Sequence, residues 1–160
     1  MTSVTRRSIL TAGAMAATFP GMVFSQVSPR RGGTLRISVD QAPNVLHPLL
    51  TRVNPEYMLS ELLYSGLSRL GTDMTPQPDL AESWTPSADV KEWTFNLRPN
   101  LRFHDGSPCT AKDVAATFKA ILDPKTASAA RTNVGPIAEV AAQDDRKVVF
   151  KLSAPYADLP

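Results

Sequence analysis

Residues 78–114 read PDLAESWTPSADVKEWTFNLRPNLRFHDGSPCTAKDV, and this stretch decides the fold. Its middle part, residues 92–98, alternates apolar and polar side chains, which is typical of a half-buried strand. Trp93, Phe95 and Leu97 are expected to share the buried face. The preceding residues 79–84 are expected to form a short turn that delivers Trp84 to the core, because a large aromatic ring in such a place normally buries itself.

The last part of the same stretch predicts a tight turn followed by a capped helix. Asp105-Gly106 is a dipeptide typical of tight turns. Thr110 and Asp113 have the spacing of a helix N-cap and the acidic residue that answers it. The helix is expected to end at Asp123-Pro124, since proline cannot continue a helix.

Elements on both sides complete a mixed pattern of helices and strands. Asn54 can cap a helix with Pro55 at its first position. Strands are expected at residues 34–39 (with Leu35, Ile37 and Val39 on one face), 67–70, 137–142 and 147–152, and the last two form a hairpin around Asp144-Asp145. The predicted fold class is therefore α+β.

The N-terminus has the pattern of an export signal. Residues 5–10 read TRRSIL, a twin-arginine pattern, and the apolar stretch that follows is too short and too interrupted to span a membrane. The sequence predicts a twin-arginine signal peptide at residues 1–25, handled by the Tat export machinery, and a periplasmic protein. Loss of Arg6 and Arg7 lowers the basic count from 17 to 15, against 15 acidic residues, so the net charge falls from +2 to zero. Nothing in that balance favours nucleic-acid binding.

The sequence contains no motif that predicts catalysis or a metal site. It lacks a GxSxG elbow, an HExxH pair and a phosphate-binding glycine loop, so a protein without enzymatic activity or cofactor is predicted. His47 and His104 lack metal-ligand spacing relative to the nearby acids Asp40, Asp105 and Asp113. Cys109, the single cysteine, is expected to be a small, partly buried side chain and not a reactive thiol.

The order of these motifs resembles the family 5 extracellular solute-binding proteins, the peptide, dipeptide and nickel receptors of bacterial ABC importers. A run of the form PxLAESW…WTFxLRxxxxFHDGxPxTAxDV is a hallmark of that family. Further similar segments are GGTLRIS (32–38), LHPLL (46–50), ELLYSGLSRL (61–70) and VVFKLSAPYADLP (148–160). The resemblance implies a partial periplasmic binding protein-like fold of type II. Family members are several times longer, so the chain is expected to be an N-terminal fragment.

The resemblance also implies an organisation and a function. Residues 26–33 would be a linker, 34–45 the start of ligand-binding lobe I, and 46–160 the extra α+β domain of the family. The implied function is that of the periplasmic substrate-binding component of an ABC importer. Such a protein, expected to be a monomer, captures a small, peptide-like solute between two lobes and delivers it to a membrane permease with its ATPase.

The residues that the family resemblance places in the ligand wall come from two loops. By motif position they are Arg52, Val53, Asn54, Ala130 and Arg131. Arg52 can pair with a ligand carboxylate through its planar guanidinium, although a solvated loop arginine explains the residue equally well. The chain departs from the family pattern at Ala130, where peptide-binding relatives often have an aromatic residue, and at His47, where the family more often has Asp. The first departure predicts a differently shaped pocket.

Two other interpretations stay open at this stage. One is an exported enzyme whose catalytic part lies outside these 160 residues. The other is a truncated relic without function. The downstream coding sequence would distinguish them from a receptor.

Overall fold

The computed structural model describes residues 32–160, so the predicted signal peptide and most of the linker lie outside the described residues. The chain divides between Ile37 and Ser38 into two units. In the first unit, the described residues 32–37 have no regular secondary structure. The second unit contains all the helices and strands that follow.

The strand predicted at residues 34–39 is absent from the structure. Leu35 and Ile37 are 83% and 62% exposed, and no described strand pairs with this segment. A strand needs a neighbour to satisfy its backbone N–H and C=O groups and to cover its apolar face. The alternating pattern is present in the sequence, but the described residues supply no such neighbour.

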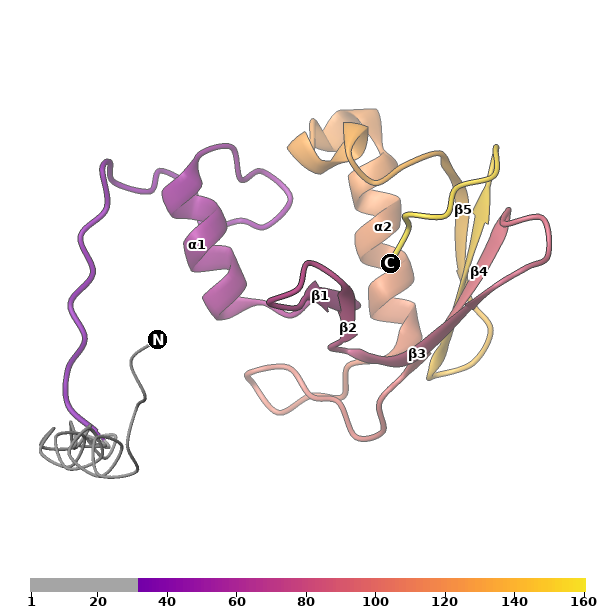
Figure 1. The fold of residues 1–160 in the computed structure, drawn as a ribbon, viewed down its shortest axis with the longest axis horizontal. Coiled ribbons are helices and arrows are strands. Elements are labelled where there is room, and N and C mark those ends of the chain that lie inside the picture. Colours follow the sequence, from indigo (N-terminus) through magenta and orange to yellow (C-terminus); the bar gives the residue numbers. More distant parts are fainter. Residues whose placement is uncertain (1–31) are drawn as a thin grey trace, which may run out of the picture. The chain divides into compact units, whose positions relative to one another are not determined.

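The second unit is built on a four-stranded antiparallel sheet. Its strands are β3 (Ala81–Pro86), β4 (Glu92–Leu97), β5 (Ile137–Ala142) and β6 (Lys147–Leu152), in the order β3-β4-β6-β5 (Figure 1). Trp93 lies opposite Phe150, and Phe95 lies opposite Val148. The sheet therefore joins two segments that are far apart in the chain, and it confirms both the predicted strand and the predicted hairpin.

Strand β3 replaces the turn that the sequence predicts at residues 79–84. Trp84 pairs with Phe95 and Ser83 with Asn96 in the antiparallel ladder between β3 and β4. β3 lies at the edge of the sheet, and Glu82 and Ser83 are exposed. The polar side chains and flanking prolines of an edge strand resemble those of a turn, which explains the wrong prediction.

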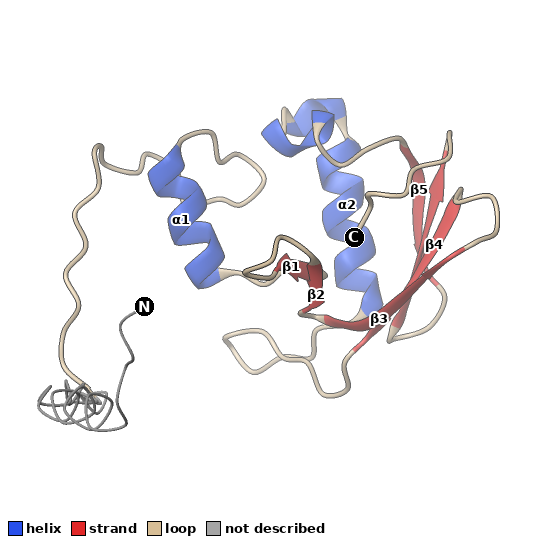
Figure 2. Ribbon diagram, in the orientation of Figure 1, coloured by secondary structure: helices blue, strands red, loops and turns tan. Residues whose placement is uncertain are grey.

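Helix α2 (Ala111–Leu122) lies along one face of the sheet and contacts β5 and β6 (Figure 2). The main-chain N–H and the hydroxyl of Thr110 both donate to Asp113 Oδ2, at 2.7 and 2.8 Å. Asp123 caps the C-terminal end of the helix, and its Oδ1 accepts a hydrogen bond from Lys125 N at 2.9 Å. Both predicted ends of this helix are confirmed.

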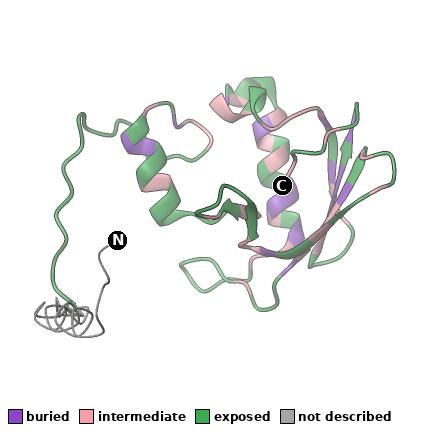
Figure 3. Cartoon of the chain, viewed as in Figure 1, coloured by how far each residue is buried: buried purple, intermediate pink, exposed green. Residues whose placement is uncertain are grey.

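The core lies between α2 and the sheet (Figure 3). Phe150, which is 1% exposed, has its ring centroid 5.2 Å from that of Phe95 and 4.8 Å from that of Phe118, both in edge-to-face geometry. Trp93 is buried and its Nε1 donates to the carbonyl of Tyr156 at 3.0 Å. Trp84 packs on this core with its ring 6.0 Å from Phe95, but it is only half buried.

Before the sheet the chain forms α1 (Asn54–Leu63) and a two-stranded antiparallel ribbon of β1 (Ser68–Leu70) and β2 (Pro76–Pro78). The predicted strand at 67–70 is confirmed as β1, and β2 pairs with it. Val53, and not Asn54, caps α1, so the helix begins one residue earlier than predicted. After α2 come two short 3₁₀ helices, η2 (Pro124–Thr126) and η3 (Ala129–Thr132). Within residues 32–160, no helix has the length and apolar character needed to cross a membrane.

Candidate ligand-binding site

Glu56, in the first turn of α1, organises the loop from which three of the predicted ligand residues come. The residue is 3% exposed. Its Oε1 accepts hydrogen bonds from the N–H groups of Asn44 and Val45 at 3.1 and 3.0 Å. Oε2 accepts from Arg52 N at 2.8 Å and from Val53 N at 3.4 Å. One side chain therefore fixes two separate parts of the same loop.

These hydrogen bonds favour the ionised form of Glu56. The bond from Arg52 N contributes most to the lowering of the pKa below its ordinary value, burial opposes it, and the other main-chain N–H groups support it. The carboxylate is thus a charged acceptor placed among main-chain donors at the N-terminal end of a helix. The dipole of the helix favours a negative charge at its N-terminal end.

Further side-chain hydrogen bonds join α1 and its C-cap residue to the same loop. Tyr57 Oη donates to the carbonyl of Thr51 at 3.2 Å, and Tyr64 Oη, from the cap position after the helix, donates to the carbonyl of Leu46 at 2.8 Å. Thr51 is 3% exposed, and its hydroxyl donates to the carbonyl of His47 at 3.1 Å and lies 3.4 Å from Ser60 Oγ. Glu56, Ser60 and Tyr64 are spaced by four, so they lie along one side of the helix.

A single hydrogen bond links this loop to the segment after α2. Ser128 is 8% exposed, and its hydroxyl donates to the carbonyl of Leu49 at 2.7 Å across 79 residues of sequence. Ser128 is also the residue that precedes η3. A buried hydroxyl with a well-placed partner fixes the relative position of the two backbone segments that it joins.

The five predicted ligand residues lie on these two linked segments. Arg52 is exposed, Val53 is the half-buried cap of α1, and Asn54 is its exposed first residue. Ala130 is half buried in η3, and Arg131 next to it is exposed. The bond between Leu49 and Ser128 joins the segments a few residues before Arg52 and before Ala130. Among residues 32–160, neither Arg52 nor Arg131 takes part in an ion pair.

Sequence reasoning missed Glu56 and Ser128, the two side chains that hold these segments. A signal for Glu56 is present, because an acidic residue at the third helical position is typical of a capping box. The signal is hidden when the cap is assigned to Asn54, since Glu56 then falls at the second position. Ser128 has no comparable signal, since its partner is 79 residues away.

The possible metal ligands do not come together. His47 Nδ1 accepts a hydrogen bond from Leu49 N at 3.3 Å, and His104 is exposed in the turn before α2. In the described part of the chain, no three His, Cys, Asp or Glu side chains form a group that could hold a metal ion. Cys109 is partly buried, and burial, with a smaller effect of the Asp113 carboxylate, raises the pKa of its thiol. A raised pKa lowers the fraction of reactive thiolate.

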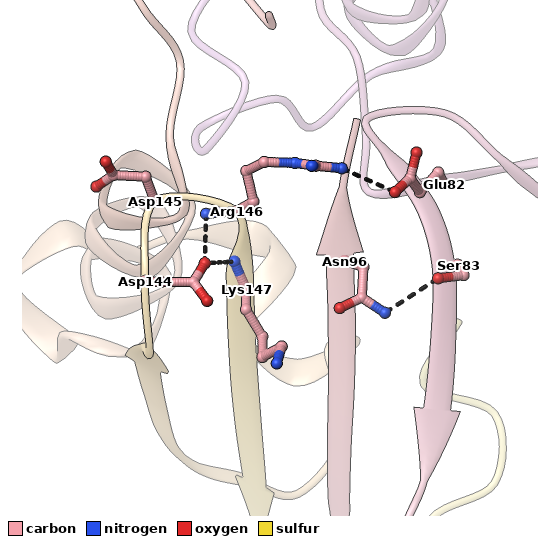
Figure 4. Close-up of a pocket in the computed structure, with 7 residues that line it drawn as sticks. All are labelled: Glu82, Ser83, Asn96, Asp144, Asp145, Arg146 and Lys147. Atoms are coloured by element: carbon pink, nitrogen blue, oxygen red, sulfur yellow. Dashed lines mark hydrogen bonds and ion pairs between the residues drawn. The ribbon is translucent and has the colours of Figure 1, made fainter. Parts of the chain in front are cut away.

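Two hollows of the second unit lie apart from the predicted ligand residues. The larger, about 570 Å³, is open and polar, and Figure 4 shows that it lies across β3, β4 and the turn before β6. There Arg146 pairs with Glu82 at 2.8 Å, and Asp144 Oδ1 accepts the N–H groups of Arg146 and Lys147 (Figure 4). The turn predicted at Asp144-Asp145 is confirmed. The smaller hollow, about 240 Å³, is lined mainly by core residues around Phe118 and Phe150. None of the five predicted residues lines either hollow.

Comparison with known proteins identifies the family. The sequence profile of the bacterial extracellular solute-binding proteins, family 5 (middle region), matches residues 75–160, more than half of the chain. The chain belongs to this family. The periplasmic oligopeptide-binding protein OppA of Escherichia coli K12 is 36% identical over 134 residues, which cover 80% of this chain and 24% of OppA.

Solved structures of other binding proteins support the same assignment. The binding protein AgaA of A. tumefaciens R10, in complex with agropinic acid, matches with a TM-score of 0.69 at 33% identity and covers 74% of this chain and 24% of AgaA. NikZ of Campylobacter jejuni, in complex with Ni(L-His), matches with a TM-score of 0.69 at 29% identity, covering 76% and 24%. The fold is therefore that of a type II periplasmic binding protein in part. The chain spans about a quarter of the length of the relatives that it matches.

Proposed function

We propose that the protein is the periplasmic substrate-binding component of an ABC importer. The observation that carries the proposal is the match of residues 75–160 to family 5. In this function the protein acts as a monomer that binds a small solute reversibly and delivers it to a membrane permease with its ATPase. Export by the twin-arginine route, indicated by residues 5–10, would bring it to the periplasm.

Residues 46–160 would then form most of the extra domain of the family, and residues 34–45 would begin lobe I. The exposed apolar face of Leu35, Ile37 and Val39 supports this division, because a strand of that composition is stable only when a sheet covers it. The domain around α2 would supply one wall of the site. Ligand binding would favour a closed arrangement of the lobes only through tighter binding to that arrangement.

A peptide-like solute fits the chemistry of the proposed wall. Arg52 and Arg131 are exposed and free of ion pairs among the described residues, so either guanidinium can bind a carboxylate in bidentate geometry. Similar proteins bind different solutes: OppA is an oligopeptide-binding protein by name, AgaA was solved in complex with agropinic acid, and NikZ was solved in complex with Ni(L-His). Ala130 stands where peptide-binding relatives often have an aromatic residue, so the pocket would differ in shape from theirs at this position.

A thermal-shift screen of the full-length protein tests the proposal. The panel contains Ala-Ala, trialanine, glutathione, a disaccharide and the nickel–histidine complex. At a concentration about 100 times Kd, a ligand that binds only the folded state stabilises it by about 2.7 kcal/mol, which gives a clear rise in Tm. We expect a saturable rise with at least one peptide-like compound. No shift with any compound would contradict the proposed function.

A further inference from the structure

Glu56 has a feature that helix capping alone does not require. A Glu at the third position of a helix caps it by accepting the N–H of the cap residue. Here that bond, from Val53 N, is the longest of the four, at 3.4 Å. The three shorter bonds come from Asn44, Val45 and Arg52, all outside the helix. The carboxylate therefore binds the N–H groups of the loop more closely than the N–H of the helix cap.

The position of these bonds connects them to ligand binding. Two of the four N–H groups belong to Arg52 and Val53, which are predicted ligand residues. The other two belong to the far end of the same loop. One buried carboxylate holds the loop backbone at both ends, and its bonds at Arg52 and Val53 fix the backbone from which the Arg52 side chain leaves the surface. A site held in one conformation binds more tightly than one that must become ordered on binding.

Among residues 32–160, main-chain dipoles alone balance the charge of Glu56. The ion pairs of the described residues are Lys112–Asp145, Arg146–Glu82 and Lys151–Glu139, and none includes Glu56. All four of its hydrogen-bond donors are backbone N–H groups. Its neighbour Arg52 uses only its main chain in this contact, so the Arg52 guanidinium is left for another partner.

We propose that Glu56 is the positioning residue of the ligand-binding loop: by holding the N–H groups of Asn44, Val45, Arg52 and Val53 together, it fixes the conformation in which Arg52 to Asn54 face the ligand. Glu56 itself does not contact the ligand. The proposal rests on the proposed function, because it names the residue that shapes the site used in that function.

The test compares Glu56→Gln with Glu61→Gln in the full-length protein. The first substitution keeps the size of the side chain but puts an NH₂ group in place of one acceptor oxygen, where it faces N–H donors. Glu61 lies on the same helix and is exposed, so the same substitution there is the matched control. Each variant is titrated by calorimetry with trialanine, glutathione and the nickel–histidine complex. Amide hydrogen exchange is measured in parallel.

For whichever probe the unsubstituted protein binds, Glu56→Gln is expected to raise Kd about tenfold or more with unchanged stoichiometry, because at least one charge-assisted hydrogen bond is lost. Exchange at Arg52 and Val53 should accelerate, while exchange in β4 and β6 should not. Glu61→Gln should match the unsubstituted protein in both measurements. A purely structural role would instead lower the stoichiometry, through loss of folded protein, and leave Kd unchanged.

The outcomes separate this proposal from the proposed function. If the unsubstituted protein binds a probe and Glu56→Gln binds it with the same Kd, the positioning role is overturned and the receptor function stands. Unchanged exchange at Arg52 and Val53 in Glu56→Gln also overturns it. If the unsubstituted protein binds none of the probes, the proposed function is overturned, and the positioning role is overturned with it.

Discussion

At the scale of single residues, short polar contacts fix the ends of the helices. The cap of α2 differs in one detail from the usual capping box. Thr110 donates both its N–H and its hydroxyl to Asp113 Oδ2, so the acid does most of the capping. The threonine hydroxyl contributes as a donor, where it usually acts as an acceptor.

Replacing Asp113 by Ala should therefore destabilise the second unit. The change removes both bonds and a favourable negative charge from the first turn of α2, and the expected loss is about 1 kcal/mol. Urea unfolding of the purified chain, followed by tryptophan fluorescence, measures it. Lys112→Ala is the control: its pair with Asp145, at 3.3 Å, joins side chains that are 76% and 73% exposed. That substitution should change the stability by less than about 0.5 kcal/mol. Equal losses in the two variants would contradict the assigned cap.

A second residue-scale prediction concerns the link between the two segments that carry the predicted ligand residues. Ser128→Ala removes the donor to the Leu49 carbonyl, and the expected cost is about 1 kcal/mol because that acceptor stays partly buried. Hydrogen exchange should rise in residues 47–53 and in η3 but not in β6. Ser65→Ala, at an exposed serine after α1, provides the comparison. If exchange in residues 47–53 is the same in both variants, the bond does not hold the segments together.

At the scale of elements, α2 and the sheet depend on close packing of small and large side chains. Ala115 is 5% exposed and faces the core, whereas Ala116 next to it is exposed. Ala115→Leu should destabilise the chain by about 1–3 kcal/mol, since the added carbons have no space. Ala116→Leu, the same change one residue along, should stay within about 0.5 kcal/mol of the original. Thermal and urea unfolding of both variants check this. Equal stabilities would mean that α2 is rotated relative to the orientation described.

Local sequence patterns predicted two kinds of element correctly. These are elements whose partners are close in sequence and strands in which apolar and polar residues strictly alternate. Residues 92–97, 110–122 and 137–152 carry such patterns, and all form as expected. β3 was missed because an edge strand needs little apolar surface. The strand predicted at 34–39 was wrong because alternating apolar residues indicate a face that can be buried but not whether a neighbouring strand is present to pair with it. For the site, motif position gave Arg52 and Ala130. A capping-box pattern indicates the contact of Glu56 with Val53, but the contacts of Glu56 with Asn44 and Val45 and of Ser128 with Leu49 depend on loop geometry that no local pattern encodes.

At the scale of the whole molecule, the core found within residues 32–160 occupies only the later part of that range. Every buried member of the hydrophobic cluster, and every partly buried side chain packed on it, lies between Leu67 and Leu159. The earlier part exposes apolar side chains instead: Leu35 is 83% exposed and Leu62 is 77% exposed. The second unit therefore has one hydrophobic core in its later part and exposed apolar side chains, Leu62 among them, before β1.

This division predicts different behaviour for two lengths of the chain. Residues 65–160 keep β1 to β6 and α2 and should unfold in one cooperative transition, because the entire core is retained. Residues 26–160 should show the same transition but bind the dye ANS more strongly and associate at high concentration, since Leu35, Ile37 and Leu62 are exposed apolar side chains. Leu62→Lys in the longer chain should reduce both effects without lowering Tm, because the side chain it replaces is mostly in water. Calorimetry measures the unfolding transition, ANS fluorescence the dye binding and sedimentation the association. Non-cooperative unfolding of residues 65–160 would show that the segment before β1 is part of the core after all.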